Sequence, residues 1–241
     1  DAAALSRAAD AALFRSKSLG RNRVSMFTPE LLAGSAARFR MEQSLRRAIA
    51  ERKLVLEYQP QVSLTDGVTT SFEALVRWRR EDGTLVSAAD FIPIAEQSGL
   101  IIAIGDWGLD TAIVAASEWR AAGMANPHIA INVSMPQLFD RSFVERAGAT
   151  LARYGLPPST LELELTESAF QTGAATIDAL QRARELGLPI ALDDFGTGYS
   201  SLTSLSQLPL RRVKLDRSLI ADLDTNPRSA AIARAIISVC H

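Results

Sequence analysis

The chain has 241 residues, 47% of them hydrophobic, which is enough for one large domain or two small ones with a sizeable core. A formal net charge of -1 creates no overall field that would favour a nucleic-acid polymer or an anionic membrane as partner. A single cysteine excludes an internal disulfide framework, two histidines argue against a His-rich zinc site, and no apolar stretch is long enough to cross a bilayer. We therefore expect a cytoplasmic chain, within a parent protein that other segments could anchor to a membrane.

Past about residue 40, short strand-like segments alternate with amphipathic helical patterns. The first two strands are joined by Thr65-Asp66-Gly67, a hairpin signal that predicts an antiparallel first strand. Strand and helix then alternate, which predicts a parallel sheet with right-handed crossovers. The predicted strands cover residues 54–64, 71–78, 128–134, 161–167, 189–194 and 211–216. The predicted helices cover residues 88–98, 105–122, 136–154, 173–186 and 228–240.

Two closures of such a sheet compete: an open doubly wound sheet and a TIM-like (β/α) barrel. In the predicted strand 161–167, Leu161, Leu163 and Leu165 share one face, and the glutamates between them share the other. A parallel sheet covered by helices on both faces should be apolar throughout, whereas a barrel strand can direct polar groups to an interior site. The other strands also carry polar groups of matching parity, mostly near their C-terminal ends, where barrel active sites lie. We therefore predict an α/β fold of the TIM-like barrel type.

The number of strands does not complete a barrel. Six strands are predicted, whereas a full barrel has eight and takes roughly 250 residues. Six unclosed strands would leave two exposed parallel edges, which favour aggregation. We therefore expect that the C-terminal strands are missing from this chain, and we hypothesise that residues follow His241.

The polar side chains on the interior face form an oxygen-rich set. Its members, with Glu167 just past its strand, are Glu73, Asn132, Glu164, Asp193, Asp194 and Lys214. Carboxylates and an amide oxygen are ligands that Mg²⁺ or Mn²⁺ prefers, in contrast to zinc. The adjacent Asp193 and Asp194 repel each other when ionised, and two metal ions would offset this repulsion if one carboxylate bridged them. Two-metal sites stabilise the attacking and leaving oxygens of a phosphoryl displacement.

Two basic residues suit the same chemistry. Lys214, held among carboxylates, could position a water molecule or help to deprotonate it. Arg77 offers the planar fork that binds a phosphate oxygen. Each residue alone also has an ordinary explanation, such as a solvent-facing strand glutamate, a polar turn, or a pair between Lys214 and Asp216. The functional interpretation is favoured because five strands supply matching groups at a matching depth.

Several motifs together resemble those of the EAL domain, a family that hydrolyses the bacterial second messenger cyclic di-GMP to linear pGpG. They are EALVRW at 73–78, INVS at 131–134, ELTES at 164–168, DDFGTGYSSL at 193–202 and VKLDRS at 213–218. YQPQV at 58–62 also matches the opening strand of the family, which contacts the guanine nucleotide. The resemblance covers about residues 38–241, and the motifs are highly specific as a set.

The resemblance implies a role for each matching residue. A first metal ion would be bound by Glu73, Asn132, Glu164 and Asp193, and a second by Asp193 and Asp194, both ions being Mg²⁺ or Mn²⁺. The residues expected to be catalytic are Glu73, Lys214, Asp194 and Glu167. Lys214 matches the lysine that contacts the attacking water, and Glu167 matches the glutamate that shapes the loop at 194–202. The positions expected to bind cyclic di-GMP are Gln59, Arg77 and Leu75. The loop at 194–202, after the fifth predicted strand, is implicated in dimer contacts, so a homodimer is expected.

Residues 5–27 resemble the last helix and strand of a GGDEF domain, the diguanylate cyclase fold. The chain contains no GG[DE]EF signature, so cyclase activity cannot come from this piece. We therefore divide the chain into a GGDEF-like fragment at 1–30, a linker helix at 31–45 and an EAL domain at 46–241 that is incomplete at its C-terminus. An ordinary amphipathic helix followed by a short strand is the alternative interpretation of the N-terminus.

The chain also departs from the family. The family continues with a strand whose glutamate, in an EGVE-like motif, completes the second metal site, and with a loop whose glutamine contacts the nucleotide. Neither occurs in this chain. A metal-dependent phosphodiesterase and a receptor that binds cyclic di-GMP without cleaving it therefore remain alternatives, and the filled ligand positions favour catalysis. A third hypothesis, an enolising barrel enzyme with Lys214 as base, gives no role to the adjacent Asp193 and Asp194.

Overall fold

The computed structural model describes residues 1–18, 22–167, 169, 174–196 and 208–240. The chain divides into two compact units. One unit comprises Asp1–Leu54 and Trp78–Leu100, and the other comprises Val55–Arg77 and Ile101–His241. In the part of the chain that the structure describes, no helix is both long and apolar enough to cross a membrane.

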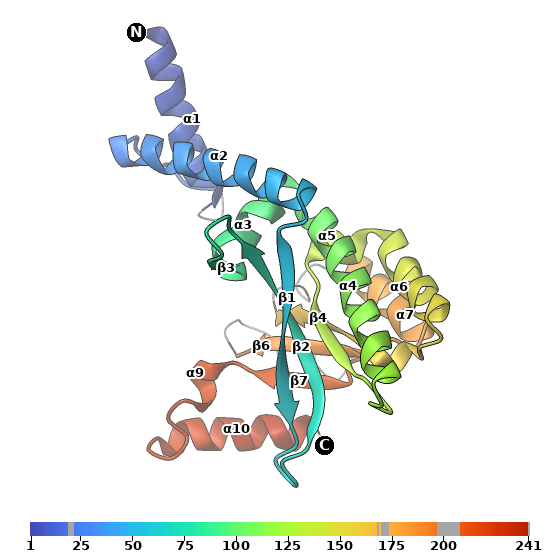
Figure 1. Cartoon of the computed structure of the whole chain (residues 1–241). Helices are drawn as coiled ribbons and strands as arrows, with labels where there is room; N and C mark the ends of the chain where they lie inside the picture. The colour runs from blue at the N-terminus through green and yellow to red at the C-terminus, as the bar shows by residue number, and fades with distance from the viewer. Residues whose placement is uncertain (19–21, 168, 170–173, 197–207, 241) are drawn as a thin grey trace. The chain divides into compact units, whose positions relative to one another are not determined.

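A seven-stranded sheet organises the fold (Figure 1). Its hydrogen-bonded order is β1-β2-β4-β5-β6-β7, with β3 paired to β2. The strands are β1 (Leu54–Val62), β2 (Thr69–Arg79), β3 (Leu85–Ser87), β4 (Ile129–Asn132), β5 (Leu161–Thr166), β6 (Ile190–Phe195) and β7 (Arg212–Leu215). The pairs β2/β4, β4/β5, β5/β6 and β6/β7 are all parallel. The order of the described strands therefore has two ends, β1 and β7.

The first strand runs against the second, as the sequence predicts. β1 and β2 are connected only by residues 63–68, where the Ser63 N–H donates to the Val68 carbonyl at 2.9 Å. So short a connection can join only antiparallel strands, because a parallel pair needs a long crossover. Gly67 adopts φ 71°, and the Asp66 carboxylate accepts from the Val68 N–H, which closes the turn.

All six predicted strands are present, and β3 is a short addition that the sequence pattern did not reveal. The helices are α1 (Ala2–Ser18), α2 (Pro29–Ala50), α3 (Ala88–Ser98), α4 (Ile101–Ala121), α5 (Met135–Phe139), α6 (Arg141–Arg153), α7 (Ala174–Glu185), α9 (Arg217–Ile220) and α10 (Pro227–Cys240). A 3-10 turn, η1 (Pro158–Thr160), precedes β5.

The prediction of one helix at 136–154 is wrong, because the segment forms two helices, α5 and α6. The break lies at Asp140, whose backbone is extended. Its carboxylate accepts hydrogen bonds from the Ser142 N–H and hydroxyl, so Asp140 caps the start of α6. An internal cap of this kind ends the first helix although the apolar periodicity continues through it.

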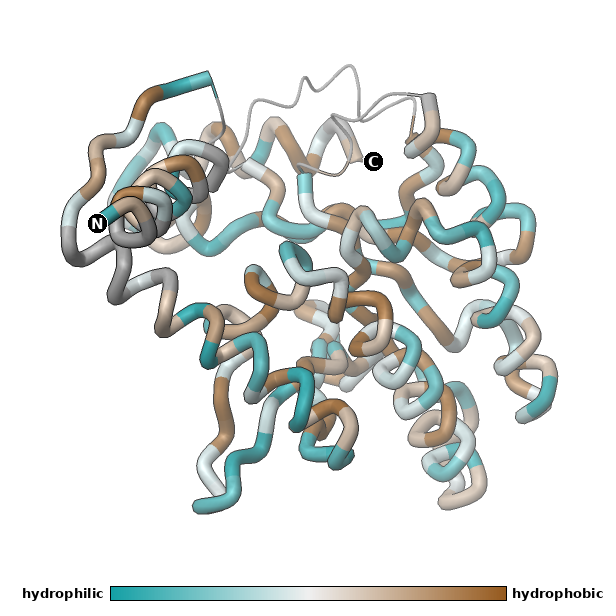
Figure 2. Tube along the Cα trace, turned by 90° about the horizontal axis from the view of Figure 1, so that it is seen from above, coloured by the Kyte–Doolittle hydropathy of each residue, from teal (hydrophilic) through white to brown (hydrophobic). Residues whose placement is uncertain are grey.

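The core of the larger unit lies between the outward face of the parallel strands and the helices α4, α6 and α7 (Figure 1). Leu163 and Leu165 of β5 are fully buried there, against a surface that includes Ala112 and Ile113 of α4. Polar and apolar residues alternate along the helices (Figure 2), as is typical of helices that pack one side against a sheet. The predicted separation of leucines and glutamates on β5 is therefore confirmed, with the leucines facing the helices.

The smaller unit contains α1, α2, α3 and β3. Phe91 of α3 is fully buried and packs edge-on against Trp78, with ring centroids 6.2 Å apart. α2 contains the predicted linker helix and extends beyond it on both sides. Residues 22–28 form no strand, which corrects the strand expected there; a strand needs a hydrogen-bonded neighbour. The assignment of residues 1–30 to a GGDEF-like fragment, 31–45 to a linker and 46–241 to an EAL domain remains a prediction.

α5 begins directly after β4 and depends on a glycine in α4. Gln137 is buried, and its amide oxygen accepts from both the backbone N–H and the hydroxyl of Ser134. A Cβ added at Gly105 would overlap the Gln137 amide, whereas a Cβ at Gly108 would meet nothing within 4 Å. Gly105 therefore provides space for the side chain that closes the first turn of α5.

We expect Gly105→Ala to lower the free energy of unfolding by about 1–3 kcal/mol, because Gln137 must leave Ser134 to make room. Gly108→Ala, in the same helix, should be neutral or stabilising by up to about 1 kcal/mol, because it has space and alanine favours helix. Urea denaturation of both variants measures the difference. Equal stabilities for the two variants would contradict this account of the packing.

Candidate functional site

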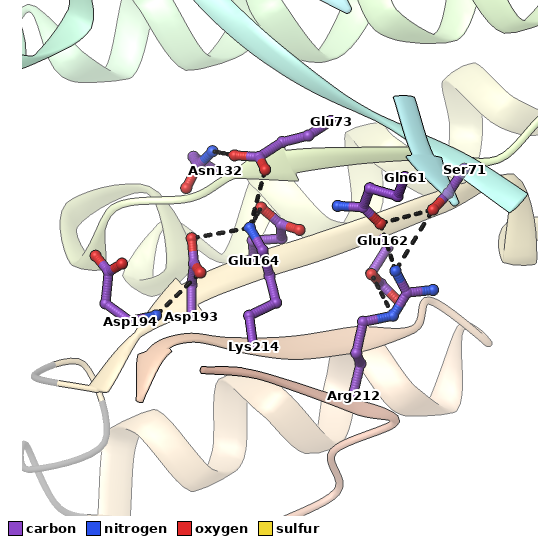
Figure 3. A network of polar contacts seen from close by, with 10 residues as sticks. All are labelled: Gln61, Ser71, Glu73, Asn132, Glu162, Glu164, Asp193, Asp194, Arg212 and Lys214. Atoms are coloured by element: carbon purple, nitrogen blue, oxygen red, sulfur yellow. Dashed lines mark hydrogen bonds and ion pairs between the residues drawn. The ribbon is translucent and has the colours of Figure 1, made fainter. Parts of the chain in front are cut away.

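The side chains predicted from strand parity meet around the ammonium group of Lys214 (Figure 3). Its Nζ lies 2.8 Å from Glu164 Oε2, 3.0 Å from Glu73 Oε2 and 3.1 Å from Asp193 Oδ2. These residues stand on β7, β5, β2 and β6, so four strands contribute to one point. The convergence follows from strand parity, because side chains of one parity on neighbouring strands lie on one face of the sheet.

Asn132 joins this group from β4. Its Nδ2 donates to Glu73 Oε1 at 3.0 Å, and its Cα is the register partner of Glu164 in β5. The bond to Glu73 uses the amide NH₂ group, so the amide oxygen is the atom that can bind a cation. Glu73, Asn132, Glu164, Asp193 and Lys214 are therefore brought together, as the sequence predicts.

Asp194 adopts a conformation that the sequence does not reveal. Strict alternation along β6 would turn it to the face opposite Asp193. Instead, Asp194 has φ 53°, and the register between β6 and β7 shifts between Leu192 and Phe195. Its carboxylate consequently extends from the same side of the ribbon as that of Asp193 (Figure 3). A left-handed backbone is uncommon in residues other than glycine, and such conformations cluster at functional sites.

Glu167 fixes the segment that follows β6. Its side chain is buried, and Oε2 accepts a hydrogen bond from the Gly196 N–H at 3.0 Å. Gly196 has φ 106°, a conformation that favours glycine, and a Cβ there would force the Leu219 side chain to shift. The expected link between Glu167 and the loop at 194–202 is thus present at the start of that loop. Residues 197–202 lie outside the described residues.

The three positions expected to contact substrate lie on the β1–β2 hairpin. Leu75 and Arg77 share the parity of Glu73 on β2. Gln59 is exposed on β1 and shares the parity of Glu57, whose Oε2 lies 2.8 Å from Arg77 Nε. The three residues therefore lie on the face that carries Glu73, but the guanidinium of Arg77 is paired with Glu57. The sequence pattern did not reveal this partner, although Glu57 stands two residues before Gln59.

The electrostatics of the cluster depend on burial and on one cation. Burial raises the pKa of Glu164 to about 7, and the charges of Glu73 and Asp193 act in the same direction against the attraction of Lys214. Burial alone would lower the pKa of Lys214, but the Glu164 and Glu73 carboxylates outweigh it and hold the pKa above its ordinary value. Burial and the Asp193 charge raise the pKa of Asp194. Lys214 is therefore an ammonium at neutral pH.

This donor set fits a divalent cation. Oxygens of Glu73, Glu164 and Asp193 lie within 4.8 Å of one another, and an amide from Asn132 adjoins them. The Lys214 ammonium lies among these oxygens, so the site already stabilises positive charge there. Hard oxygen donors of this kind suit Mg²⁺ or Mn²⁺ and lack the nitrogen or sulfur that zinc prefers. Asp194 lies outside this set of three and could serve a second ion beside Asp193.

A second polar layer lies beside the first and was not recognised from the sequence. It consists of Gln61, Ser71, Glu162 and Arg212 (Figure 3). The signal that could have revealed it is spacing, because Ser71, Glu162 and Arg212 each precede a site residue by two positions.

Comparison with known proteins now identifies the family. Residues 42–241 match the family described as "EAL domain". The chain belongs to the EAL domain family. The solved structure titled "PaMucR Phosphodiesterase, c-di-GMP complex" is similar to it with a TM-score of 0.77 and 39% sequence identity, over 83% of this chain and 81% of that one. The predicted TIM-like α/β fold is therefore confirmed.

Two longer bacterial proteins are similar in sequence. The bifunctional diguanylate cyclase/cyclic di-GMP phosphodiesterase MucR of Pseudomonas aeruginosa is 38% identical over 232 residues, which are 96% of this chain and 34% of that protein. The cyclic di-GMP phosphodiesterase PdeR of Escherichia coli is 35% identical over 242 residues, which are 100% of this chain and 36% of that protein. The chain thus spans about a third of the length of these relatives.

We expect Glu164 to make stability depend on pH. Its pKa is about 7 in the folded protein, whereas an unfolded glutamate has a pKa of about 4.3. The folded state therefore holds the proton more tightly, and the resulting stability is complete at low pH and lost as pH rises through 7. The free energy of unfolding of the wild type, minus that of Glu164→Gln, should fall by up to about 3 kcal/mol between pH 4.5 and 8.

Denaturant titrations in a chelating buffer measure this difference. Glu145→Gln is the matched control, because Glu145 is exposed on α6, outside the carboxylate cluster, and the substitution is the same. A difference between wild type and Glu164→Gln that stays flat or rises over this range would show that the account of the Glu164 environment is wrong.

Proposed function

We propose that this chain is a metal-dependent phosphodiesterase that hydrolyses cyclic di-GMP to linear pGpG. The observation that carries the proposal is the convergence of three carboxylates, an amide and a lysine on one interior point. Membership of the EAL domain family and the similarity to a phosphodiesterase complexed with cyclic di-GMP support the choice of substrate. The similarity to proteins named as cyclic di-GMP phosphodiesterases supports the reaction.

Two divalent ions, Mg²⁺ or Mn²⁺, are part of the proposal. Glu73, Asn132, Glu164 and Asp193 would hold the first, and Asp193 and Asp194 the second. When bound, such ions offset negative charge on the phosphate and lower the pKa of water. The left-handed conformation of Asp194 supports the second site, because it brings two neighbouring carboxylates to one side of the strand.

The side chains of the β1–β2 hairpin are proposed to bind the nucleotide. Arg77 presents a guanidinium to the face that carries Glu73, and a phosphate oxygen would replace Glu57 as its partner. Gln59 lies exposed on the same face and offers an amide to a guanine edge. Leu75 lies between Glu73 and Arg77 on β2, shares their parity, and would add apolar contact to the nucleotide.

Lys214 is proposed to position the attacking water. Because its pKa is raised, Nζ is an ammonium that donates hydrogen bonds, so holding the water suits it better than removing a proton from it. The water oxygen adds to the phosphorus of one phosphodiester group while the P–O3′ bond breaks. The water gives up one proton to solvent and O3′ takes one up from solvent, so O3′ leaves as a hydroxyl and the product is linear pGpG with a 5′-phosphate.

Glu167 is proposed to act at a distance from the reaction. By holding Gly196 it fixes where the loop at 194–202 leaves β6, next to Asp193 and Asp194. The same loop is proposed to form the contact of a homodimer. Glu167 would thus connect the arrangement of the metal ligands with the dimer interface.

The second candidate function is a receptor that binds cyclic di-GMP without cleaving it. The second metal site gives this alternative its basis, because among the described residues only Asp193 and Asp194 are assigned to it. Affinity and turnover measured on one sample separate the two functions. A receptor would bind the nucleotide with no release of pGpG at any concentration of Mn²⁺.

We expect Glu73→Gln to lower kcat by at least about 100-fold, because it removes a charge from the carboxylate cluster while preserving shape. Chromatography of nucleotides after incubation of the protein with cyclic di-GMP and Mn²⁺ measures the change. Glu145→Gln should retain wild-type turnover. Addition of a chelator should stop the reaction of the wild type and of Glu145→Gln. Turnover by Glu73→Gln at the wild-type rate would exclude this site as the catalytic centre.

A further inference from the structure

We propose that Arg212 is a positioning residue. Through a layer of contacts beside the site, it fixes the positions of Lys214, Glu164 and Glu73 along their strands relative to one another. The layer consists of Gln61, Ser71, Glu162 and Arg212 and is called the supporting layer here. This inference deepens the proposed phosphodiesterase function and rests on it.

The supporting layer connects strands from both ends of the sheet order (Figure 3). Arg212 Nη1 on β7 donates to Gln61 Oε1 on β1 and, at 3.4 Å, to Ser71 Oγ on β2. Its Nε lies 3.5 Å from Glu162 Oε1 on β5. The Ser71 hydroxyl also donates to Gln61 Oε1 at 2.6 Å, which closes the network. One guanidinium thus contacts three other strands.

Three strands carry both a site residue and, two positions earlier, a residue of the supporting layer. The pairs are Ser71 with Glu73, Glu162 with Glu164, and Arg212 with Lys214. Residues two positions apart on a strand point to the same face and lie about 7 Å apart along it. Because each pair shares one stretch of backbone, the contacts of Arg212 set the relative heights of Glu73, Glu164 and Lys214.

β7 needs such support more than the other strands. It has four residues, all partly exposed, and among the described strands it pairs with β6 alone. The register of that pair shifts between Leu192 and Phe195. Main-chain hydrogen bonds therefore leave the position of β7 less well defined than that of the central strands, and Lys214 is carried on this strand.

The charge of Glu162 points to the same role. Its side chain is fully buried, and within the described residues neither carboxylate oxygen has a hydrogen-bond partner. Its ion pair with Arg212 offsets part of the cost of this burial. Buried ion pairs add little net stability compared with apolar side chains, and some of them specify a unique arrangement instead. Here the arrangement that the pair specifies includes the site residues.

The test compares Arg212→Met with Arg211→Met in the full chain. Arg211 is exposed at the neighbouring position, so its substitution is the matched control. Arg212→Met should lower kcat for cyclic di-GMP by about 10- to 100-fold and weaken Mn²⁺ binding by a similar factor. The substitution removes support for Lys214 and for the two proposed metal ligands Glu73 and Glu164. KM should change by less than about twofold, since the Arg77–Glu57 pair and the Ser71–Gln61 hydrogen bond of the hairpin do not involve Arg212. Arg212→Lys should lie between wild type and Arg212→Met, because it keeps the charge and loses the fork.

A purely structural role predicts another result: Arg212→Met would lower the melting temperature while folded molecules kept wild-type kcat and Mn²⁺ affinity. That result overturns the inference. If Arg212→Met does not fold, Gln61→Leu replaces it, because this substitution leaves the ion pair between Arg212 and Glu162 intact. An unchanged kcat and an unchanged Mn²⁺ affinity in Gln61→Leu would then overturn the inference. If the wild type does not cleave cyclic di-GMP, the proposed function fails, and Mn²⁺ affinity decides the inference separately. Weaker binding by Arg212→Met than by Arg211→Met supports it, and equal binding overturns it.

Discussion

The attraction between the Lys214 ammonium and three carboxylates is the interaction on which the site depends. Glu73, Glu164 and Asp193 would repel one another if they were ionised at this distance without a cation. Lys214 reduces that repulsion in the folded chain, and burial leaves Glu164 with a pKa of about 7 despite it. The cluster is thus held together by charges that only the fold brings close, and it is prepared for additional positive charge.

The fold produces this cluster by separating the two faces of its strands. On β5 the leucines are buried against the helices, while the glutamates face inward. The helices bury apolar area outside the sheet, and this burial provides the driving force that allows costly polar groups to be held inside. Two interior layers follow from the two-residue period of the strands, one with Lys214 and one with Arg212. The first layer suits chemistry, and the second suits support.

The sequence predicted the features that depend on local period and missed those that depend on three-dimensional contacts. Parity alone placed Glu73, Glu164 and Lys214 on one face, because alternation along a strand is a local property. The rotation of Asp194 was not predictable, since it arises from a left-handed backbone and a register shift against β7. The helix break at Asp140 was missed because a side-chain cap leaves the apolar pattern unchanged. The contacts of Arg212 join residues up to 151 positions apart and have no local signature.

Anomalous diffraction from crystals grown with Mn²⁺ would locate a metal ion in this cluster. We expect an anomalous peak bound by carboxylate oxygens of Glu73, Glu164 and Asp193. A peak elsewhere, or carboxylates that point away from one another when Mn²⁺ is present, would contradict this expectation.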